Sequence, residues 1–319
     1  TYKQSTKTTL SKFVDSFTVS KHSLALLRGA EELVTFEYIA ALKNFLKDEN
    51  LSKIDLISLH GQTIFHDPIN KLSIQLCDEV KIKGVFNLPI VSDFRQKDLS
   101  LGGQGAPLTP IFHKLIMLES KFTLPVCFVN IGGISNITVL DDQGHIYAYD
   151  TGPGMCLLDQ YISRKKKINF DKGGKYSLKG IINLTILNKL MSDKYFRKKK
   201  NKSLDRNYFS LKPFMKLNFN DACSTISAFT ALTITKEANR SNAKYLIVSG
   251  GGSKNKYVIN LMKETFKGKL FTANHLNLNP DFIESQAFAY LGIRRIRDLP
   301  ISFPSTTGVK YAVSGGNVN

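Results

Sequence analysis

Three short glycine clusters, each placed after a run of apolar residues, constrain the fold of this chain most. They are NIGGISN around Gly132 and Gly133, DTGPG at 150–154, and SGGGSKN at 250–252. A short apolar run that ends in a tight turn predicts a strand. The third cluster leads at once into YVINLMKETF, which has helical apolar spacing. Strand, turn and helix in quick succession predict an α/β fold, in which amides at a helix N-terminus attract anions. The alternative is three tight turns without a ligand, since turns and close packing also use glycine.

The remaining pattern adds further strands and helices. The run IDLISLHGQT predicts a strand that ends in a polar turn at 60–63, and KLSIQLCDEVKIKG predicts a strand followed by a short helix. Three consecutive strands are expected over 126–130, 135–140 and 146–150, as a β-meander. Helices are expected over 23–46, from 155 to about 194, over 222–238 and over 283–299.

A length of 319 residues, 42% of them hydrophobic, is enough for two lobes. We expect a first lobe over 1–100 and a second over 101–319, with a C-terminal tail that can return to the first.

No run is long enough to span a bilayer, and the N-terminal segment lacks the apolar core of a secretory signal. The four cysteines form no CxxC or Cys/His cluster, which favours a reducing compartment and predicts no metal site. A cytoplasmic protein without a membrane partner is therefore expected.

The net charge of +18 is the one extreme value of the composition. A basic field favours nucleic acid or anionic membranes, but it also helps an anionic nucleotide approach. The excess is lysine spread along the whole chain, and no zinc-finger spacing, basic heptad region or aromatic RNA signature accompanies it. A nucleic-acid partner is therefore not expected, although it stays the third hypothesis.

Asp150 is the strongest single candidate for chemistry. It follows Tyr147-Ala148-Tyr149 at the end of a predicted strand and precedes a glycine-rich bend. A carboxylate that projects into a cleft there can accept a proton from an attacking water or hydroxyl. The alternative, of equal weight, is an Asp that caps the helix starting near Met155.

Other polar candidates are less specific. His60 fits substrate hydrogen bonding or turn stabilisation better than zinc, because the only second His at ligand spacing is His66 and HxxxxxH without an intervening Glu is not a zinc pattern. Asp93 and Arg95 lie on the same side of an extended segment, so they can pair with each other or grip a polar ligand. Lys202 and Arg206 are loop cations that can neutralise phosphate, although such residues are usually exposed.

Several motifs occur together in one order: HGQT, DFRxxD with GGQGAPL, NIGGISNIT, YDTGPG, KSLDR, SGGGSKN, DFIESQAFAYL and LPISFPSTTG. Walker A, protein-kinase and GxSxG patterns are missing from the sequence. From about Leu56 to Gly315 the sequence resembles the anhydro-N-acetylmuramic acid kinase family.

The resemblance implies a two-lobed α/β fold of the sugar kinase, Hsp70 and actin superfamily, with ribonuclease H-like lobes and a first lobe incomplete at its N-terminus. It also implies a reaction in which water opens 1,6-anhydro-N-acetylmuramic acid while ATP, with Mg²⁺, phosphorylates O6. The products are N-acetylmuramic acid 6-phosphate and ADP, in cell-wall recycling, and a homodimer is implied.

The resemblance assigns roles to particular residues. Asp150 matches the aspartate that activates the water. The residues that match the sugar-binding side of the family's cleft are His60, Gln62, Thr63, Asp93, Arg95, Gln104, Gly105 and Pro107. The last three belong to the loop from Gly103 to Pro107. The residues that match the family's glycine-rich turns around the nucleotide are Asn130, Gly132, Gly133, Thr151, Gly152, Gly154, Gly250, Gly251, Gly252 and Asn255.

The sequence departs from the family pattern in three places. The family opens with a GTSxDGxD-type loop that grips ATP phosphates, and no such segment precedes His60 here. Met155 stands where Asn is usual, and Cys77 stands where Gly is usual. The alternative reading is thus a truncated, inactive homologue that retains only sugar binding or a structural role.

Overall fold

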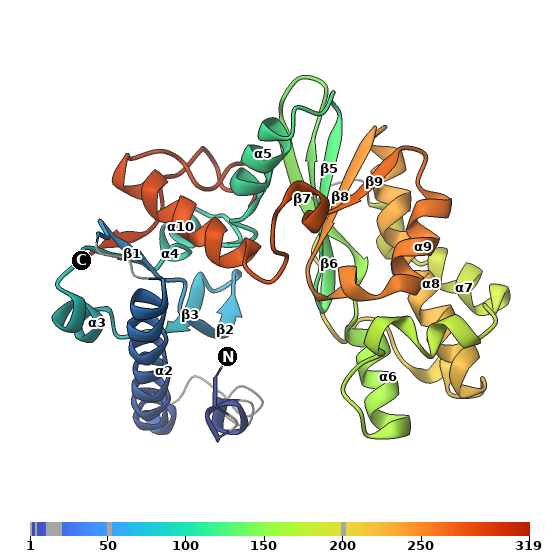
Figure 1. The fold of residues 1–319 in the computed structure, drawn as a ribbon, viewed down its shortest axis with the longest axis horizontal. Coiled ribbons are helices and arrows are strands. Elements are labelled where there is room, and N and C mark those ends of the chain that lie inside the picture. The colour runs from blue at the N-terminus through green and yellow to red at the C-terminus, as the bar shows by residue number, and fades with distance from the viewer. Residues whose placement is uncertain (1, 4, 11–20, 50–52, 199–201) are drawn as a thin grey trace. The chain divides into compact units, whose positions relative to one another are not determined.

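The chain divides into two compact units. The structure, a computed structural model, describes residues 2–3, 5–10, 21–49, 53–198 and 202–319. The first unit comprises Thr1–Leu108 and Ser285–Asn319, and the second comprises Thr109–Glu284. Each unit contains a β-sheet and helices (Figure 1), so the predicted α/β class is confirmed.

The second unit is built on a five-stranded sheet. Its strands are β5 (Val126–Ile131), β6 (Ile134–Leu140), β7 (Ile146–Pro153), β8 (Tyr245–Ser249) and β9 (Lys269–Thr272). They lie in the order β7-β6-β5-β8-β9, in which β6 is antiparallel to both neighbours and β5, β8 and β9 are parallel. Numbered within the unit, this is the order 3-2-1-4-5, which is the arrangement of a ribonuclease H-like lobe.

Alternation of side chains along β5 explains how helices cover both faces of this sheet. Cys127, Val129 and Ile131 pack with apolar residues of α8 (Phe219–Arg240) and α9 (Lys256–Thr265). On the opposite face, His113 of α5 (Pro110–Glu119) stacks on Phe128 with ring centroids 4.1 Å apart. Figure 1 shows α8 and α9 lying along the strands. The predicted meander and the helix over 222–238 are confirmed, with the ends shifted by up to three residues.

The segment after β7 is less continuous than predicted. It contains α6 (Cys156–Lys166), η1 (Lys172–Gly174), η2 (Ser177–Lys179), α7 (Leu184–Met191) and η3 (Lys194–Arg197), and η4 (Lys212–Phe214) follows. Gly173 and Gly174 both have positive φ, at 66° and 79°. The prediction of one helical run from 155 to about 194 is therefore wrong. Helix α6 ends at Lys166, where Lys167 adopts a left-handed φ of 56°, and the two glycines interrupt the segment again further on.

The first unit contains two smaller sheets. Strands β1 (Ile57–Ser58), β4 (Ile90–Ser92) and β10 (Asn317–Val318) form one, and β2 (Gln62–Asp67) with β3 (Leu72–Leu76) forms a hairpin. Its helices include α2 (Lys21–Asp48), α3 (Glu79–Phe86), α4 (Gln96–Ser100) and α10 (Ile283–Ile296). The polar turn predicted at 60–63 is shorter than expected, since Gln62 already begins β2.

Candidate functional site

Asp150 lies on an edge strand at a β-bulge. Asn136 of β6 pairs with Asp150, whereas its neighbour Ser135 pairs with Gly152, so that Thr151 is the extra residue. Strand β7 is one of the two edge strands of this sheet. A bulge at a sheet edge re-aims the side chain beside it.

Hydrogen bonds from outside the sheet hold Asp150 in place. Its N–H donates to the carbonyl of Lys202 at 2.9 Å, and Oδ2 accepts from the N–H of Leu204 at 2.8 Å. Its carbonyl accepts from the hydroxyl of Tyr195 at 2.7 Å. The N-cap of α6 is Met155, and its side chain makes no capping hydrogen bond. Asp150 is therefore not the helix cap that the sequence allowed.

Burial raises the pKa of Asp150 to about 6, while the Leu204 N–H and the positive charge of Lys202 act in the opposite direction. Within the described residues, Oδ1 makes no hydrogen bond. A half-buried carboxylate with one oxygen held and a pKa near neutrality is suited to accept a proton.

A cavity of about 610 Å³ lies outside the carboxyl ends of β5 and β8. Open α/β sheets bind ligands at such ends. Five of the predicted nucleotide residues line it, namely Gly132, Gly133, Gly251, Gly252 and Asn255. Two separate glycine turns are thus brought to one cavity.

Close backbone approach explains why glycine stands at these turns. The N–H groups of Gly154 and Met155 donate to the carbonyls of Gly133 and Gly132, at 2.9 and 2.8 Å. A Cβ on Gly154 would overlap the carbonyl of Gly132, and one on Gly252 would overlap the side chain of Ile131. The TGPG bend is therefore packed directly onto the turn at Gly132 and Gly133.

The other predicted nucleotide residues are not among those that line this cavity. Thr151 is buried, and its hydroxyl donates to the carbonyl of Ser135 at 3.2 Å. A Cβ on Gly152 would lie 2.8 Å from the hydroxyl of Thr233, and Gly250 faces the side chain of Asn130. These residues pack the wall, while their predicted contact with nucleotide stays a prediction.

Sequence reasoning missed several residues of the same cavity. They are Ile131, Met155, Asp159, Phe170, Asp171, Lys172, Gly173 and Lys254. Two buried polar atoms of the wall, Asp159 Oδ1 and Asn255 Nδ2, have no partner among the described residues. Buried polar groups are normally paired, so these two atoms are the ones suited to bond a ligand. The glycine pair in DKGG is the signal that could have found this wall.

In the first unit, three of the predicted sugar residues meet. The guanidinium of Arg95 donates from Nε to His60 Nε2 at 3.1 Å, and from Nη1 to the carbonyl of Gly105 at 2.8 Å. Burial first, and then the charge of Arg95, lowers the pKa of His60 to about 4. His60 is therefore neutral at physiological pH and accepts from Arg95.

Buried Asp98, which sequence reasoning did not select, holds the glycine-rich loop next to this cluster. Its Oδ1 accepts from the N–H of Gly105 at 2.6 Å, and its Oδ2 accepts from the hydroxyl of Thr307 at 2.6 Å. The N–H of Gln104 donates to the carbonyl of Thr307 at 2.8 Å, and the Ala106–Pro107 bond is cis. The loop is thereby held against the C-terminal segment.

The remaining sugar candidates lie around this cluster. Asp93 has a φ of 51° and accepts from Asn317 Nδ2 at 3.0 Å. Gln62 Nε2 donates to the carbonyl of Thr63 at 3.2 Å, and the hydroxyl of Thr63 accepts from Gln75 at 3.4 Å. Local bonds thus orient these side chains.

Lys202 differs from its expected role. Its side chain is fully buried and its ammonium lies 2.7 Å from Glu237 Oε1. A cation held in a buried ion pair cannot also be a surface cation for phosphate, so that suggestion is wrong for Lys202. Arg206 is exposed, as expected.

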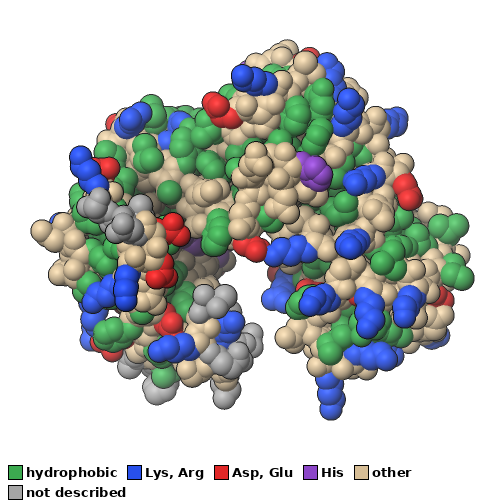
Figure 2. All heavy atoms as spheres, viewed as in Figure 1, with side chains coloured by type: hydrophobic (Ala, Val, Ile, Leu, Met, Phe, Trp, Pro, Cys, Tyr) green, Lys and Arg blue, Asp and Glu red, His purple; other side chains and the backbone are tan. Residues whose placement is uncertain are grey.

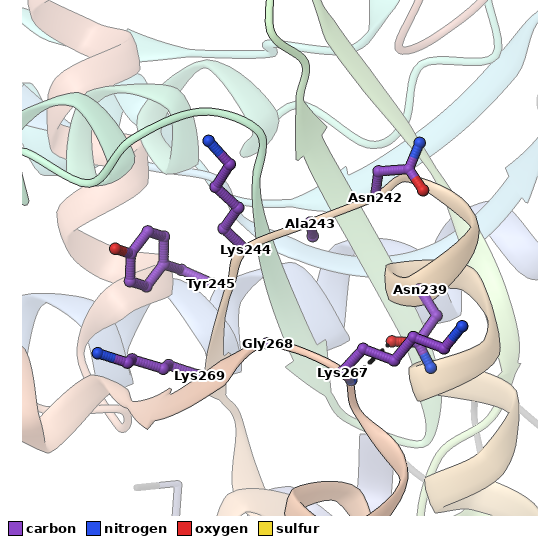
Figure 3. A pocket seen from close by; sticks show the side chains of 8 residues that line it. All are labelled: Asn239, Asn242, Ala243, Lys244, Tyr245, Lys267, Gly268 and Lys269. Carbon is purple, nitrogen blue, oxygen red and sulfur yellow. Dashed lines mark hydrogen bonds between the residues drawn. The ribbon is translucent and has the colours of Figure 1, made fainter.

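A second pocket, of about 560 Å³, lies at the amino ends of β8 and β9. Figure 3 shows that the side chains of Lys244, Lys267 and Lys269 point apart, and that Lys267 lies beside Asn239. The N–H of Lys267 donates to Asn239 Oδ1 at 2.9 Å. Because the three cations do not converge, this pocket is a poorer anion site than the cavity at the carboxyl ends.

On the face drawn in Figure 2, charged side chains do not form one patch. Figure 2 shows Lys and Arg spread over the visible face and interspersed with Asp and Glu. In the described part of the chain, no group of three or more His, Cys, Asp or Glu could hold a metal ion. Within the same residues, no helix is long and apolar enough to cross a membrane.

A ribonuclease H-like lobe, glycine turns around a cavity at its carboxyl strand ends and a carboxylate with a raised pKa are the features of a phosphotransferase. The family model described as anhydro-N-acetylmuramic acid kinase matches residues 6–319. The chain belongs to this kinase family, and the recognition made from its motifs is confirmed.

Relatives named anhydro-N-acetylmuramic acid kinase cover nearly the whole chain. The protein of Methylobacterium nodulans is 38% identical over 91% of this chain and 79% of its own length. Those of Zymomonas mobilis and Brucella canis are each 35% identical over 91% of this chain and 80% of their length.

Solved structures are more distant. The activator of the 2-hydroxyisocaproyl-CoA dehydratase from Clostridium difficile, with bound ADPNP, is 12% identical with a TM-score of 0.38, over 55% of this chain and 62% of its own. The ethanolamine utilization protein EutJ from Carboxydothermus hydrogenoformans is 13% identical with a TM-score of 0.31, over 55% and 51%. Neither likeness defines a ligand for this chain.

Proposed function

We propose that this kinase opens 1,6-anhydro-N-acetylmuramic acid with water and transfers the γ-phosphoryl group of ATP to O6. The products are N-acetylmuramic acid 6-phosphate and ADP, and the physiological setting is peptidoglycan recycling. Family membership supports the substrate class, because the family and the relatives carry that substrate in their names. The observation that carries the mechanism is the held, half-buried carboxylate of Asp150.

Asp150 is the proposed general base. It removes a proton from water, whose oxygen bonds to the anomeric carbon as the bond from that carbon to O6 breaks. O6 then takes the γ-phosphoryl group as ADP leaves, so atoms and charge balance. A pKa of about 6 leaves most Asp150 ionised at neutral pH, yet basic enough to accept the proton.

Arg95 and His60 are proposed to bind the sugar. Arg95 fixes both the imidazole of His60 and the loop carbonyl of Gly105, so the three form one polar surface in the first unit. His60 Nε2 accepts from Arg95, which leaves Nδ1 as the protonated ring nitrogen, and a backbone hydrogen bond with Gly61 also acts on this ring. The other predicted sugar residues, Gln62, Thr63, Asp93, Gln104 and Pro107, are proposed to complete this surface.

The cavity at the carboxyl ends of β5 and β8 is proposed to hold the nucleotide. The turns at Gly132 and Gly251 allow backbone groups to approach a phosphate or ribose closely, and Asn255 Nδ2 and Asp159 Oδ1 are the unpaired polar atoms.

Mg²⁺ usually binds one or two carboxylates together with nucleotide phosphates. Asp159 fits that requirement better than Asp171, both of whose oxygens accept hydrogen bonds from the residues at 176–177. Bound Mg²⁺ would neutralise developing phosphate charge.

An inactive remnant is not favoured as the alternative, since the family model matches residues 6–319. We also propose a cytoplasmic homodimer, as the family resemblance implies. Light scattering coupled to gel filtration tests the dimer.

The decisive experiment is a coupled assay of ADP release, with the protein from its complete reading frame, ATP, Mg²⁺ and the anhydro sugar. We expect ADP release that depends on the sugar, with the 6-phosphate product identified by mass spectrometry. If ADP release does not depend on the sugar, the proposed function is wrong.

A further inference from the structure

A buried ion pair lies behind Asp150 in the second unit. Lys202 Nζ is 2.7 Å from Glu237 Oε1, and neither side chain is exposed to solvent. Removing two charges from water costs several kcal/mol per ion, so a buried pair is weak evidence for stability by itself. Stability alone therefore does not explain why this ion pair is buried at this position.

The surroundings of the pair are closed and hydrogen-bonded. Glu237 Oε2 accepts from the hydroxyl of Tyr149 at 3.3 Å and lies 3.4 Å from Arg240 Nη1. The ammonium of Lys202 lies 5.1 Å from the ring centre of Tyr195 and 5.4 Å from that of Tyr149. Both carboxylate oxygens are thus engaged, and the cation is packed against aromatic faces.

The backbone that carries Lys202 is the same backbone that holds Asp150. The carbonyl of Lys202 accepts from the N–H of Asp150 at 2.9 Å, and two residues later the N–H of Leu204 donates to Asp150 Oδ2 at 2.8 Å. The side chain of Lys202 runs the other way, toward α8. Segment 202–204 is therefore bound at Lys202 to Glu237 in the core and at Leu204 to the carboxylate of Asp150.

We propose that Lys202 and Glu237 are positioning residues, whose buried pair fastens segment 202–204 and thereby aims the carboxylate of Asp150. This inference rests on the proposed function, in which Asp150 is the base. The pair does not touch the reacting atoms. It acts by fixing the donor on one carboxylate oxygen, so that the other oxygen is presented for proton transfer.

The main test uses Lys202→Met, which keeps the length of the side chain and removes its charge. We expect kcat to fall by at least about tenfold, with both KM values within about threefold, because an interaction that positions the base is lost. The acid limb of kcat/KM should move to higher pH, since the nearby positive charge that lowers the pKa of Asp150 is gone. The other groups that face this region are the Tyr195 hydroxyl on η3, Tyr149 on β7, and Glu237, Arg240 and Lys236 on α8, and all are retained.

A matched control separates positioning from stability. Thr235 lies on the same helix as Glu237, is buried, and its hydroxyl bonds that of Thr265 at 3.0 Å. Thr235→Val should lower stability without changing kcat or the acid limb. Should Lys202→Met fail to fold, Glu237→Gln takes its place, because Gln still offers Lys202 an acceptor. Glu237→Gln should also lower kcat, but by a smaller factor than Lys202→Met.

A second readout does not depend on activity. Exchange of the Leu204 amide with deuterium, measured by NMR, should be at least about tenfold faster in Lys202→Met than in the parent, while amides of β5 stay protected. If the parent shows no sugar-dependent ADP release, the proposed function fails and amide exchange alone decides this inference. Unchanged Leu204 exchange, or an unchanged kcat and acid limb in a folded active variant, would overturn it.

Discussion

The N–H of Leu204 donates a 2.8 Å hydrogen bond to Oδ2 of Asp150, across 54 positions of sequence. This bond leaves one oxygen of the carboxylate held and the other without a hydrogen bond among the described residues. The proposed chemistry depends on that asymmetry, and the first predictions address it.

Asp150→Asn should lower kcat by at least roughly a hundredfold, because an amide cannot accept the proton of water. The Asn side-chain oxygen can still accept from Leu204, so the fold and the affinity for sugar should be retained. Steady-state kinetics and calorimetric sugar binding measure the two effects. Near-normal turnover in this variant would remove Asp150 from the base role.

The pH dependence of kcat/KM should have an acid limb near pH 6, set by Asp150. The base acts when ionised, so the rate should rise about tenfold per pH unit below this value and level off above it. Burial also raises the pKa of Asp159 to about 6. Asp159→Asn removes the proposed Mg²⁺ ligand and should lower the rate, but the limb should stay near pH 6 in this variant. Loss of the limb would assign it to Asp159 and not to Asp150.

Stability should also report the raised pKa of Asp150. A group with a raised folded-state pKa stabilises the fold below its ordinary pKa, and this contribution is lost as pH rises through about 6. Asp150→Asn should therefore gain stability relative to the parent between about pH 4 and 7, by on the order of 2–3 kcal/mol. Urea unfolding at several pH values measures the difference. A difference that is flat across this range contradicts the raised pKa.

Arg95→Ala should raise KM for the sugar by about tenfold or more, because hydrogen bonds from a charged group to His60 and Gly105 are lost. KM for ATP should stay within about threefold. Arg294 in the same unit donates to the carbonyl of Pro300 at 2.7 Å and is the matched control. Arg294→Ala should affect stability only, and an equal KM effect in both variants would show that the Arg95 effect is not local.

Two neighbouring glycines should respond differently to an added methyl group. A Cβ on Gly252 would overlap Ile131, so Gly252→Ala should cost about 1–3 kcal/mol of stability. Gly251 has no heavy atom of the described chain near its Cβ position, so Gly251→Ala should fold normally and raise KM for ATP. Gly84→Ala, which adds a methyl in open space on α3, is the control. An unchanged KM for ATP in Gly251→Ala would place the nucleotide elsewhere.

The meander could be predicted from sequence because each of its strands is a short apolar run that ends in a glycine or Asp-Gln-Gly turn. Strand β9 was missed, since KLFT is four residues long and shows no clear alternation. The helical run from 155 onward was overestimated, because spacing alone does not show that Lys167 adopts the left-handed conformation that ends α6.

At the site, sequence patterns identified residues but not their partners. Asp150 was selected because a carboxylate that ends an aromatic strand and precedes a glycine bend is expected to project into a cleft. Lys202 was read as a loop cation, since neighbouring lysines suggest solvent. Its partner Glu237 lies 35 residues away on α8, and only tertiary packing brings the two together. The same limit applies to Asp98 and Thr307, which are 209 residues apart.

Segment 202–204 also has a consequence for the sheet itself. Strand β7 is one of the two edge strands, and an uncovered edge strand offers unpaired amides and carbonyls to other chains. Here the N–H of Asp150 is occupied by the carbonyl of Lys202. Segment 202–204 therefore also blocks the addition of a strand from a second molecule at β7. Loss of its contact with Asp150 would favour aggregation through this edge strand.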